Sequence, residues 1–416
     1  MWSTKIQAGA LQVTIGIVTV IALLLFSFVL LVHSHQLFKV QSHTLIQTIH
    51  ESHEGLQMTL TSSSNPTTPF QDVTENERSY WGMFQIVKST AQNKTYTSET
   101  IALIGAKQPE NRTALYLEDN GNPLVMVGNS QITGRSYLPE RGVKPGTISG
   151  NSFTGTRLIY GAQQQAYDLP ELHQELQDLL EHFRTQTINP LLKGGAQIKD
   201  LAPKHSNSFM EQTQLLYSTN AIHLIEHQLT GNIIVFSETK ITVNHLSKLE
   251  DVILVAPKIM ITDGAEGNFQ AIATEHIYVG KNVELAYPSA LVVIEKQPPG
   301  LQATTQDVSH FIRMDTKSSI SGQVVFIGKE TSYHYKSQLY IASNATVIGE
   351  VYCNQNTELN GSVLGSVFTA NFVVDQFGSI YQNHIFNGTI SIEDLPKDYV
   401  GLLFNNSKKG VAKWLY

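Results

Sequence analysis

The chain has 416 residues, and only 15% of them are charged, with 28 Lys and Arg against 35 Asp and Glu for a net charge of −7. Soluble domains usually carry about 25% charged residues, so Ser, Thr, Asn and Gln supply much of this surface instead. The chain has no basic stripe, which excludes a conventional nucleic-acid-binding protein. The single cysteine, Cys353, leaves no second thiol for an intramolecular disulfide.

The first feature along the chain is an apolar run from Leu11 to Val32, which contains no Asp, Glu, Lys, Arg, Asn or Pro. At about 1.5 Å per residue, a helix of this length spans about 33 Å, enough to cross a hydrocarbon core of about 30 Å. No later segment matches its length and purity. The sequence therefore predicts that residues 1–32 form a short cytoplasmic start and one transmembrane anchor.

Charge and cleavage signals indicate the orientation of the anchor and whether it is cleaved. Lys5 precedes the run, whereas only Lys39 follows it before Arg78, and the positive-inside rule then places the N-terminus in the cytoplasm. A cleaved signal peptide is the alternative, but its apolar region is about 7–15 residues long and ends in an A-x-A-like site, which is missing after Val32. We expect a single-pass membrane protein with a periplasmic or extracellular body. A large exported body without disulfides favours a bacterial source.

Apolar residues continue at helical spacing after the anchor. Steps of seven and four residues indicate one helical face, and the Ser, Thr and Pro residues that follow are incompatible with a helix. Residues 33–69 are therefore predicted to form a helical rod and a linker. The apolar positions of the rod are Phe38, Leu45, Ile49, Leu56 and Leu60.

The N-terminus resembles that of type IV pilin-like proteins. The segment Lys5–Gly9 precedes Ala10 and a long apolar helix, like the basic leader, the Gly cleavage point and the protruding helix of that family. Most pilins carry Glu at the fifth position after the Gly, where this chain has Thr14. The K-type minor pseudopilins, which cap the type II secretion pseudopilus, also lack that Glu. The resemblance covers about 50 residues and implies processing between Gly9 and Ala10.

Residues 70–190 are predicted to be a β-rich region that ends in one amphipathic helix. Asp119–Asn122 is typical of a turn between the apolar segments Ala114–Glu118 and Leu124–Gly128, which predicts a β-hairpin. Further along, Leu and Phe recur at helical spacing. Asp168 is a suitable N-cap for this helix, and Pro190 follows its end.

Residues 191–416 are predicted to form a parallel β-helix, or β-solenoid, so that the protein is mainly β. An apolar-x-Gly-x-apolar step recurs between Ile320 and Ile390, and this pattern suits a coil whose inward side chains stack and whose corners carry Gly. The stretch resembles bactofilin-like, polymer-forming β-helix sequences. The alternative fold is an antiparallel β-sandwich. The predicted strands are Asn232–Phe236, Lys240–Val243, Asp251–Val255, Lys258–Ile261, His276–Val279 and Ala290–Ile294.

His223, Glu226 and His227 match the H-x-x-E-H pattern of inverted zinc proteases. That chemistry needs both histidines on one face of a helix, with Glu226 as the general base. Apolar and polar residues alternate here, and Leu229–Gly231 leads directly into a predicted strand. We therefore expect no metal, no cofactor and no catalysis from this motif.

Two further sets of polar residues are candidates for a site. Tyr381, Asn383 and His384 form a candidate interaction cluster, although such Asn and His side chains commonly satisfy the backbone of a turn. A polysaccharide-cleaving β-helix needs carboxylates aligned on consecutive coils, and the acidic residues of the C-terminal half show no coil-like interval. Those residues are Asp251, Asp263, Glu266 and Glu284.

The sequence therefore predicts a membrane-anchored extracytoplasmic structural or assembly protein rather than an enzyme. Its pilin-like start places it among accessory components of a pilus or secretion pseudopilus, with protein partners in the cell envelope and no nucleic acid. The alternative is a membrane-anchored β-helix that cleaves carbohydrate or binds a surface polysaccharide. Fold alone does not distinguish these functions.

Overall fold

The computed structural model describes most of the chain, in two compact units. One unit comprises Met1–Glu77 with Lys88–Thr100, and the other comprises Arg78–Val87 with Ile101–Tyr416. The protein is mainly β, with 51% strand and 19% helix. The predicted linker is Thr61–Pro69, and only Thr61, which is helical, belongs to the described residues; these are 9–61, 74–185, 187–296, 310–329, 335–376, 378–405 and 407–415.

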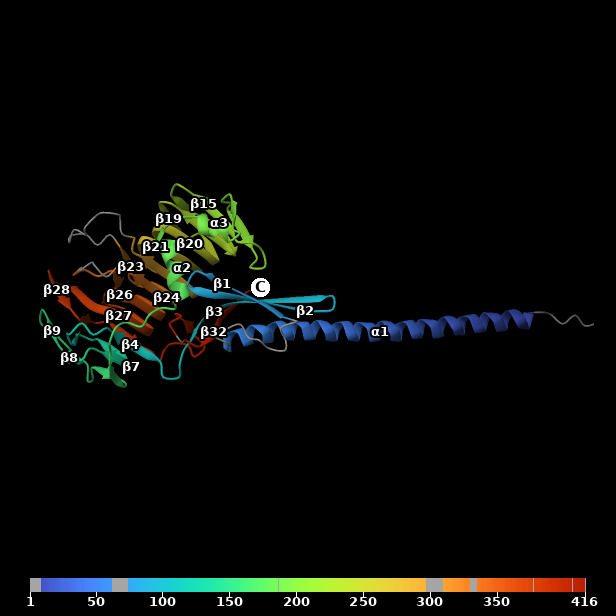
Figure 1. Ribbon diagram of the computed structural model, residues 1–416, viewed down its shortest axis with the longest axis horizontal. Coiled ribbons are helices and arrows are strands. Elements are labelled where there is room, and N and C mark those ends of the chain that lie inside the picture. Colours follow the sequence, from blue (N-terminus) through green and yellow to red (C-terminus); the bar gives the residue numbers. More distant parts are fainter. Residues whose placement is uncertain are drawn as a thin grey trace, which may run out of the picture. The chain divides into compact units, whose positions relative to one another are not determined.

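The first unit contains α1, Gly9–Thr61, a single helix of 53 residues (Figure 1). It runs without a break through the predicted anchor and rod, so the expectation of a long apolar N-terminal helix is confirmed. Among the residues that the structure describes, α1 is the one helix long and apolar enough to cross a membrane. Gly9 and Ala10, the candidate processing site, form its exposed first turn.

The C-terminal part of α1 packs mainly through small side chains. Ser52 Oγ is hydrogen-bonded to Ser98 Oγ at 3.2 Å and to Thr100 Oγ1 at 2.9 Å, both on β3, Tyr96–Lys107. Leu45 and Ile49 of the predicted apolar stripe are each 41% exposed, whereas Leu56 of the same stripe is fully buried. Short side chains let the helix approach the strand closely. The buried residues are Thr44, Thr48, Ser52, Gly55, Leu56 and Thr59.

An antiparallel sheet connects the first strands of the body to the last. Gly105 makes this pairing possible, because a Cβ there would lie 2.6 Å from the carbonyl oxygen of Gly401. The end of the chain is therefore held by one of its first strands. The sheet contains β1 (Thr74–Trp81), β2 (Phe84–Asn93) and β3 in that order, and β3 also pairs with β31 (Val400–Gly401) and β32 (Lys409–Leu415).

The remaining β structure is dominated by a stack of parallel strands (Figure 1). Six long strands pair in succession, each in parallel with the next. Ile320, Val347 and Val363 are register partners on successive strands, and all three are fully buried. This parallel pairing is incompatible with the antiparallel sandwich alternative. The six strands are β20 (Lys248–Ile261), β21 (Glu266–Val279), β22 (Glu284–Ile294), β24 (Ser319–Ile327), β26 (Thr346–Leu359) and β27 (Ser362–Gln376).

The predicted strands between Asn232 and Ile294 lie within β18 to β22, apart from Asn232 itself, which precedes β18.

Antiparallel pairing occurs between β9 and β10 and between β27 and β28. The shorter strands otherwise pair in parallel, as the long ones do. They are β4 (Thr113–Leu117), β5 (Leu124–Val127), β6 (Gln131–Thr133), β7 (Arg135–Leu138), β8 (Val143–Pro145), β9 (Thr147–Ile148), β10 (Asn151–Ser152), β11 (Ile159–Tyr160), β12 (Gln163–Gln165), β13 (Gln197–Lys199), β14 (Lys204–Asn207), β15 (Gln214–Ser218), β16 (Ile222–Leu224), β17 (Gln228–Gly231), β18 (Ile233–Ser237), β19 (Lys240–Val243), β23 (Phe311–Met314), β25 (Leu339–Ile341), β28 (Ser379–Gln382), β29 (His384–Phe386) and β30 (Thr389–Ser391).

The order of strands in the stack differs from their order in the chain. β4, β5 and β6 pair in parallel with β27, β29 and β30, so the strands after residue 113 continue the stack beyond the C-terminal strands. The predicted hairpin around Asp119–Asn122 is therefore wrong, because β4 and β5 each pair with strands from other layers. The register pairs give the succession β13, β15, β18, β20, β21, β22, β24, β26, β27, β4, β7, β12.

Two helices connect β12 to β13, which stand at the two ends of this succession. α2, Gln174–Thr185, packs on β21 and β22 through its buried Leu176, Leu180 and Phe183, and α3, Asn189–Lys193, follows it. The expected helix start at Asp168 is wrong. Leu172 instead forms an antiparallel bridge with Phe404, and this tertiary pairing holds the preceding segment extended.

Many strands of the stack are buried on both faces. Ile253, Leu254 and Val255 are successive residues of β20, and each is at most 2% exposed. Leu254 belongs to the core enclosed by the stacked strands, whereas Ile253 and Val255 belong to a second core with α2 and the antiparallel sheet. Covering on both faces is the usual reason for continuous apolar runs in parallel strands.

The recurrent Gly of the sequence forms a column across three strands. Gly322, Gly349 and Gly365 are register partners with φ of 143°, 147° and 155°. A Cβ on Gly349 would lie 1.9 Å from the carbonyl oxygen of Gly322, and one on Gly365 would lie 1.8 Å from that of Gly349. Any side chain in this column would therefore push adjacent strands apart.

We expect Gly349→Ala to lower the free energy of unfolding by at least about 3 kcal/mol, because the methyl group meets backbone that has no room to move. Gly121→Ala is the matched control, since Gly121 has a φ of 74° but no atom within 4 Å of the added Cβ. It should cost only the backbone strain of about 1–2 kcal/mol. Urea unfolding followed by circular dichroism measures both, and equal losses would contradict the close stacking of the column.

Candidate functional site

The H-x-x-E-H residues lie on a strand and a tight turn rather than on one helix. His223 is exposed within β16, and Glu226 has a left-handed φ of 58°. His227 Nδ1 accepts a hydrogen bond from the backbone N–H of Ile225 at 3.0 Å. Within the described ranges, no three His, Cys, Asp or Glu residues are grouped as metal ligands would be. This arrangement lacks the geometry of a zinc protease.

The Tyr381, Asn383 and His384 cluster is centred on a structural amide. Asn383 is 1% exposed, and its Nδ2 donates to Asn120 Oδ1 at 2.6 Å and to the carbonyl of Asn122 at 3.0 Å. His384 packs against the ring of Tyr381, and burial lowers the pKa of its imidazole. The buried amide joins two turns that lie far apart in the sequence, so Asn383 stabilises the fold.

The outer faces of β17, β20, β21 and β22 form an open groove of about 620 Å³. Glu266 and Glu284 are exposed register partners in this groove. The expectation that the acidic residues do not recur from layer to layer is therefore wrong for this pair. The pair is hard to recognise in the sequence because the next register partner of Glu284, on β24, is Ser319 and not an acidic residue. Lys248, Glu250 and Asn268 also line the groove.

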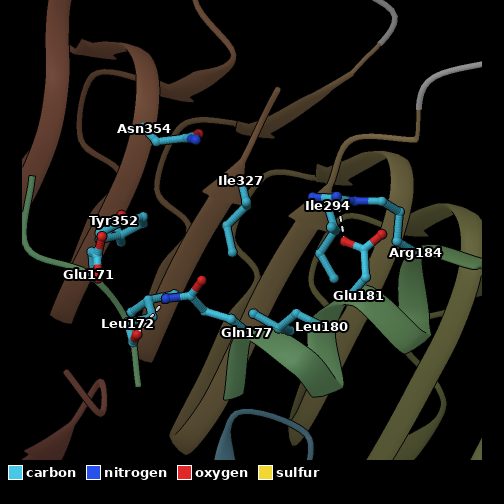
Figure 2. Close-up of a pocket in the computed structure, with 10 residues that line it drawn as sticks. All are labelled: Glu171, Leu172, Gln177, Leu180, Glu181, Arg184, Ile294, Ile327, Tyr352 and Asn354. Atoms are coloured by element: carbon cyan, nitrogen blue, oxygen red, sulfur yellow. Dashed lines mark hydrogen bonds and ion pairs between the residues drawn. The ribbon is translucent and has the colours of Figure 1, made fainter. Parts of the chain in front are cut away.

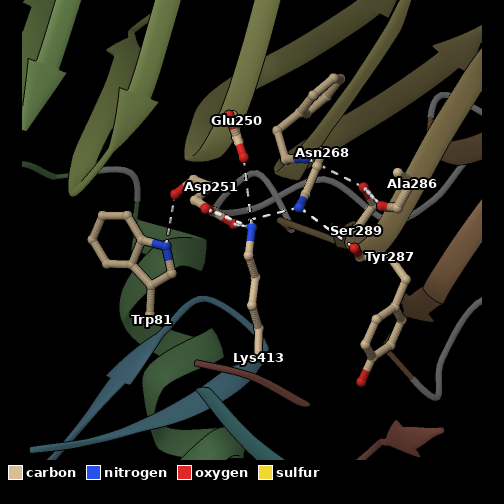
Figure 3. A network of polar contacts seen from close by, with 9 residues as sticks. Trp81, Glu250, Asp251, Asn268, Ala286, Tyr287, Ser289 and Lys413 are labelled. Carbon is tan, nitrogen blue, oxygen red and sulfur yellow. Dashed lines mark hydrogen bonds and ion pairs between the residues drawn. The ribbon is translucent and has the colours of Figure 1, made fainter. Parts of the chain in front are cut away.

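An ion pair with the last strand fixes one wall of this groove (Figure 3). Lys413 Nζ lies 2.8 and 2.7 Å from the carboxylate oxygens of Asp251 and 3.8 Å from Glu250 Oε1. The φ of Asp251 is 59°, and the register with β21 shifts at this residue. Its carbonyl accepts a hydrogen bond from Trp81 Nε1 at 3.1 Å. Asp251 thus connects β20 to β1 and β32. It helps to fix the position of the β20 backbone beside the groove.

A second hollow of about 280 Å³ lies between α2 and the stack (Figure 2). Leu180, Ile294 and Ile327 line it with apolar surface. Arg184 and Glu181 at its rim form an ion pair with an Nη1–Oε2 distance of 2.5 Å. Glu171, Gln177, Tyr352 and Asn354 complete the lining, so the hollow presents a mixed apolar and polar surface.

A buried carboxyl, Glu350 on β26, lies against the antiparallel sheet. It is 2% exposed, and it accepts hydrogen bonds from Gln108 Nε2 at 2.7 Å and from the backbone N–H of Leu402. Burial raises its pKa to about 7 against the opposing effect of these two bonds. A Cβ on Gly401 would lie 2.0 Å from Glu350 Oε2. The carboxyl therefore joins the stack to segments near both ends of the body.

Sequence reasoning missed Glu350 and the Asp251–Lys413 pair because their partners are remote in the chain. No protein-family model, no curated protein and no solved structure matches the chain. Function is therefore inferred from the residues and their geometry. The signal in the sequence for Glu350 is its position next to Gly349, one of the recurrent Gly residues.

We expect the stability of the protein to fall between pH 5 and pH 8 because of Glu350. The folded chain holds the proton of this carboxyl up to a pH of about 7, whereas the ordinary pKa of a glutamate carboxyl is 4.5. The contribution of Glu350 to stability is therefore greatest below pH 4.5, decreases as the pH rises to about 7 and is level above it. The full decrease is about 3 kcal/mol.

Glu350→Gln should remove this dependence of stability on pH. The side-chain amide can accept the hydrogen bond from Leu402 N–H and donate one to the side-chain oxygen of Gln108, and it does not titrate. Urea midpoints at pH 5 and pH 8 measure the difference between wild type and variant. Glu284→Gln, at an exposed position, serves as the control and should keep the wild-type slope. A Glu350→Gln protein with an unchanged slope would show that another group causes the pH dependence.

Proposed function

We propose that the protein is a membrane-anchored, extracytoplasmic assembly component of a bacterial envelope, with its N-terminus in the cytoplasm. α1 supplies the anchor, and the body is a parallel β-solenoid. Support for the solenoid comes from the succession of parallel strands and from the enclosed apolar core, with Ile320, Val347 and Val363 stacked in one column. Such a stack presents long outer faces to partners.

The exposed apolar stripe of α1 carries this proposal. A membrane core of about 30 Å accommodates the run from Leu11 to Val32. Leu45 and Ile49 then lie about 20 and 26 Å beyond Val32 along the helix axis, outside the headgroup region. Both are 41% exposed, and they flank the face of the helix on which Ser52 is hydrogen-bonded to β3. Large apolar side chains in such a position mark a protein interaction site.

The resemblance to type IV pilin-like proteins agrees with this arrangement. In both, an apolar helix continues from the membrane into a protruding rod that other subunits can pack against. Thr14 occupies the position of the usual Glu, as in the K-type minor pseudopilins, which favours an accessory role over that of a main subunit. Processing between Gly9 and Ala10 is part of the proposal.

We expect the Leu45→Glu/Ile49→Glu double variant to remain folded and membrane-bound but to lose its partners. Each buried Leu or Ile contributes about 1.5–3 kcal/mol, so association should weaken roughly 100-fold or more. Cross-linking in membranes followed by gel electrophoresis measures the assembled fraction. His50→Glu, at an exposed polar position of α1, is the control. Equal cross-linking of the wild type, the double variant and His50→Glu would contradict assembly through this stripe.

N-terminal sequencing of the protein extracted from the same membranes should give Ala10 as the first residue, and a start at Met1 would refute processing.

The groove favours glycan hydrolysis as a second candidate function. Register partners on neighbouring strands lie about 4.8 Å apart, close to the separation of about 5–5.5 Å between the carboxyl groups of a retaining glycosidase. One of Glu266 and Glu284 would then act as the nucleophile, and the other would act first as the general acid and then as the general base.

If the groove is catalytic, the full-length protein should release reducing ends from a soluble polysaccharide, and Glu266→Gln should lower that rate at least about 100-fold. Lys317→Gln, at an exposed position outside the groove, is the control. Absence of reducing ends from dextran, glucomannan and polygalacturonate, or their undiminished release by Glu266→Gln, would reject this candidate.

A further inference from the structure

An aromatic and charged column runs along the outer face of four strands. Tyr278, Arg313, Tyr340 and Glu358 are register partners on β21, β23, β25 and β26. Their neighbours in the strands, including Ile312 and Leu339, are fully buried. Because side chains alternate between the faces of a strand, the four residues project outward, away from the enclosed core.

The guanidinium of Arg313 lies over two aromatic rings. Its Cζ is 5.1 Å from the centroid of Tyr340 and 5.8 Å from that of Phe311. Phe311 in turn stacks on His276, with a centroid separation of 4.9 Å and an angle of 8° between the rings. Stacking fixes the guanidinium plane while leaving its N–H groups directed to the side. In the described part of the chain, no carboxylate forms an ion pair with Arg313.

A small cavity of about 190 Å³ opens beside this stack. Arg313 and Lys336 supply two positive charges to its lining, and Glu358 and Asp375 supply two negative ones. Burial raises the pKa of the Glu358 carboxyl, which accepts a hydrogen bond from Ser337 Oγ at 3.1 Å. The cavity thus combines an aromatic wall with donors and acceptors whose formal charges balance.

We propose that this cavity binds a single ring of a neutral saccharide. Arg313 and His276 cover faces of the Tyr340 and Phe311 rings, so the C–H groups of a pyranose would contact the ring edges, and its adjacent hydroxyl groups match planar side chains that donate and accept in pairs. The volume lies below the range of about 300–1,000 Å³ typical of larger ligands, which suits one ring. The balanced charges and the net charge of −7 disfavour a polyanion.

The proposal is tested by isothermal titration calorimetry on the full-length protein in lauryldimethylamine oxide, a detergent without a sugar headgroup. The probes are maltohexaose, cellohexaose and chitohexaose as neutral glycans, with a galacturonate hexamer as the acidic one. At least one neutral probe should bind with the stoichiometry of a single site. Tyr340→Ala and Arg313→Ala should each weaken that binding at least about tenfold.

Matched variants separate binding from folding. Tyr167→Ala removes a tyrosine that is 69% exposed and does not line the cavity, and it should bind as the wild type does. Arg313→Lys keeps the charge but loses the planar donor group, so it should bind as weakly as Arg313→Ala. Thermal unfolding checks that all variants are folded. No binding of any neutral probe, a preference for the acidic one, or equal binding by folded Tyr340→Ala would overturn the proposal.

Discussion

The structure depends on register between parallel strands. Each long strand pairs along both edges with the strands before and after it in the stack. Register partners on successive strands therefore lie directly above one another and need side chains of similar size. The Gly322, Gly349 and Gly365 column shows how narrow this requirement is, because each Cα lies directly against the carbonyl of the preceding layer. The buried column of Ile320, Val347 and Val363 satisfies the same requirement with apolar side chains.

The chain order makes this stack a strongly non-local structure. The strands after residue 113 complete layers that begin with β27 and β30, and α2 connects the two ends of the succession across β21 and β22. The antiparallel sheet adds a second non-local closure, through Lys413 to Asp251 and through Leu402 to Glu350. Contacts between residues so distant in sequence slow folding, and they join the start and end of the body into one cooperative unit.

The proposed functions use separate surfaces of this scaffold. In α1, Ser52 contacts β3 while Leu45 and Ile49 stay exposed, an arrangement that would serve the proposed assembly. The outer faces of the strands carry two different polar settings, an acidic groove at β20 to β22 and an aromatic, charge-balanced cavity at β23 to β26. The proposed binding of glycan at the body is compatible with the proposed binding of protein at the helix, because the two would use different elements.

The sequence by itself determined the features that depend on local pattern. The run Leu11–Val32 specifies a helix through its length and apolar content, β19 has the predicted bounds Lys240–Val243, and the recurrent Gly marks where layers touch. The outward strand context of His223 also follows from the alternation of neighbouring residues. Each of these features is decided by residues within a few positions of one another.

Only the tertiary structure decided which residues meet. The turn at Asp119–Asn122 was recognisable, but β4 and β5 pair with strands that lie more than 200 positions later in the chain. The bridge of Leu172 to Phe404 displaced the start of α2, and the register of β21 with β22 brought Glu266 to Glu284. Local pattern decides which side chains lie on each face of a strand or helix. Backbone hydrogen bonding between segments remote in sequence decides which strands become neighbours, because every buried backbone N–H and C=O group needs a partner.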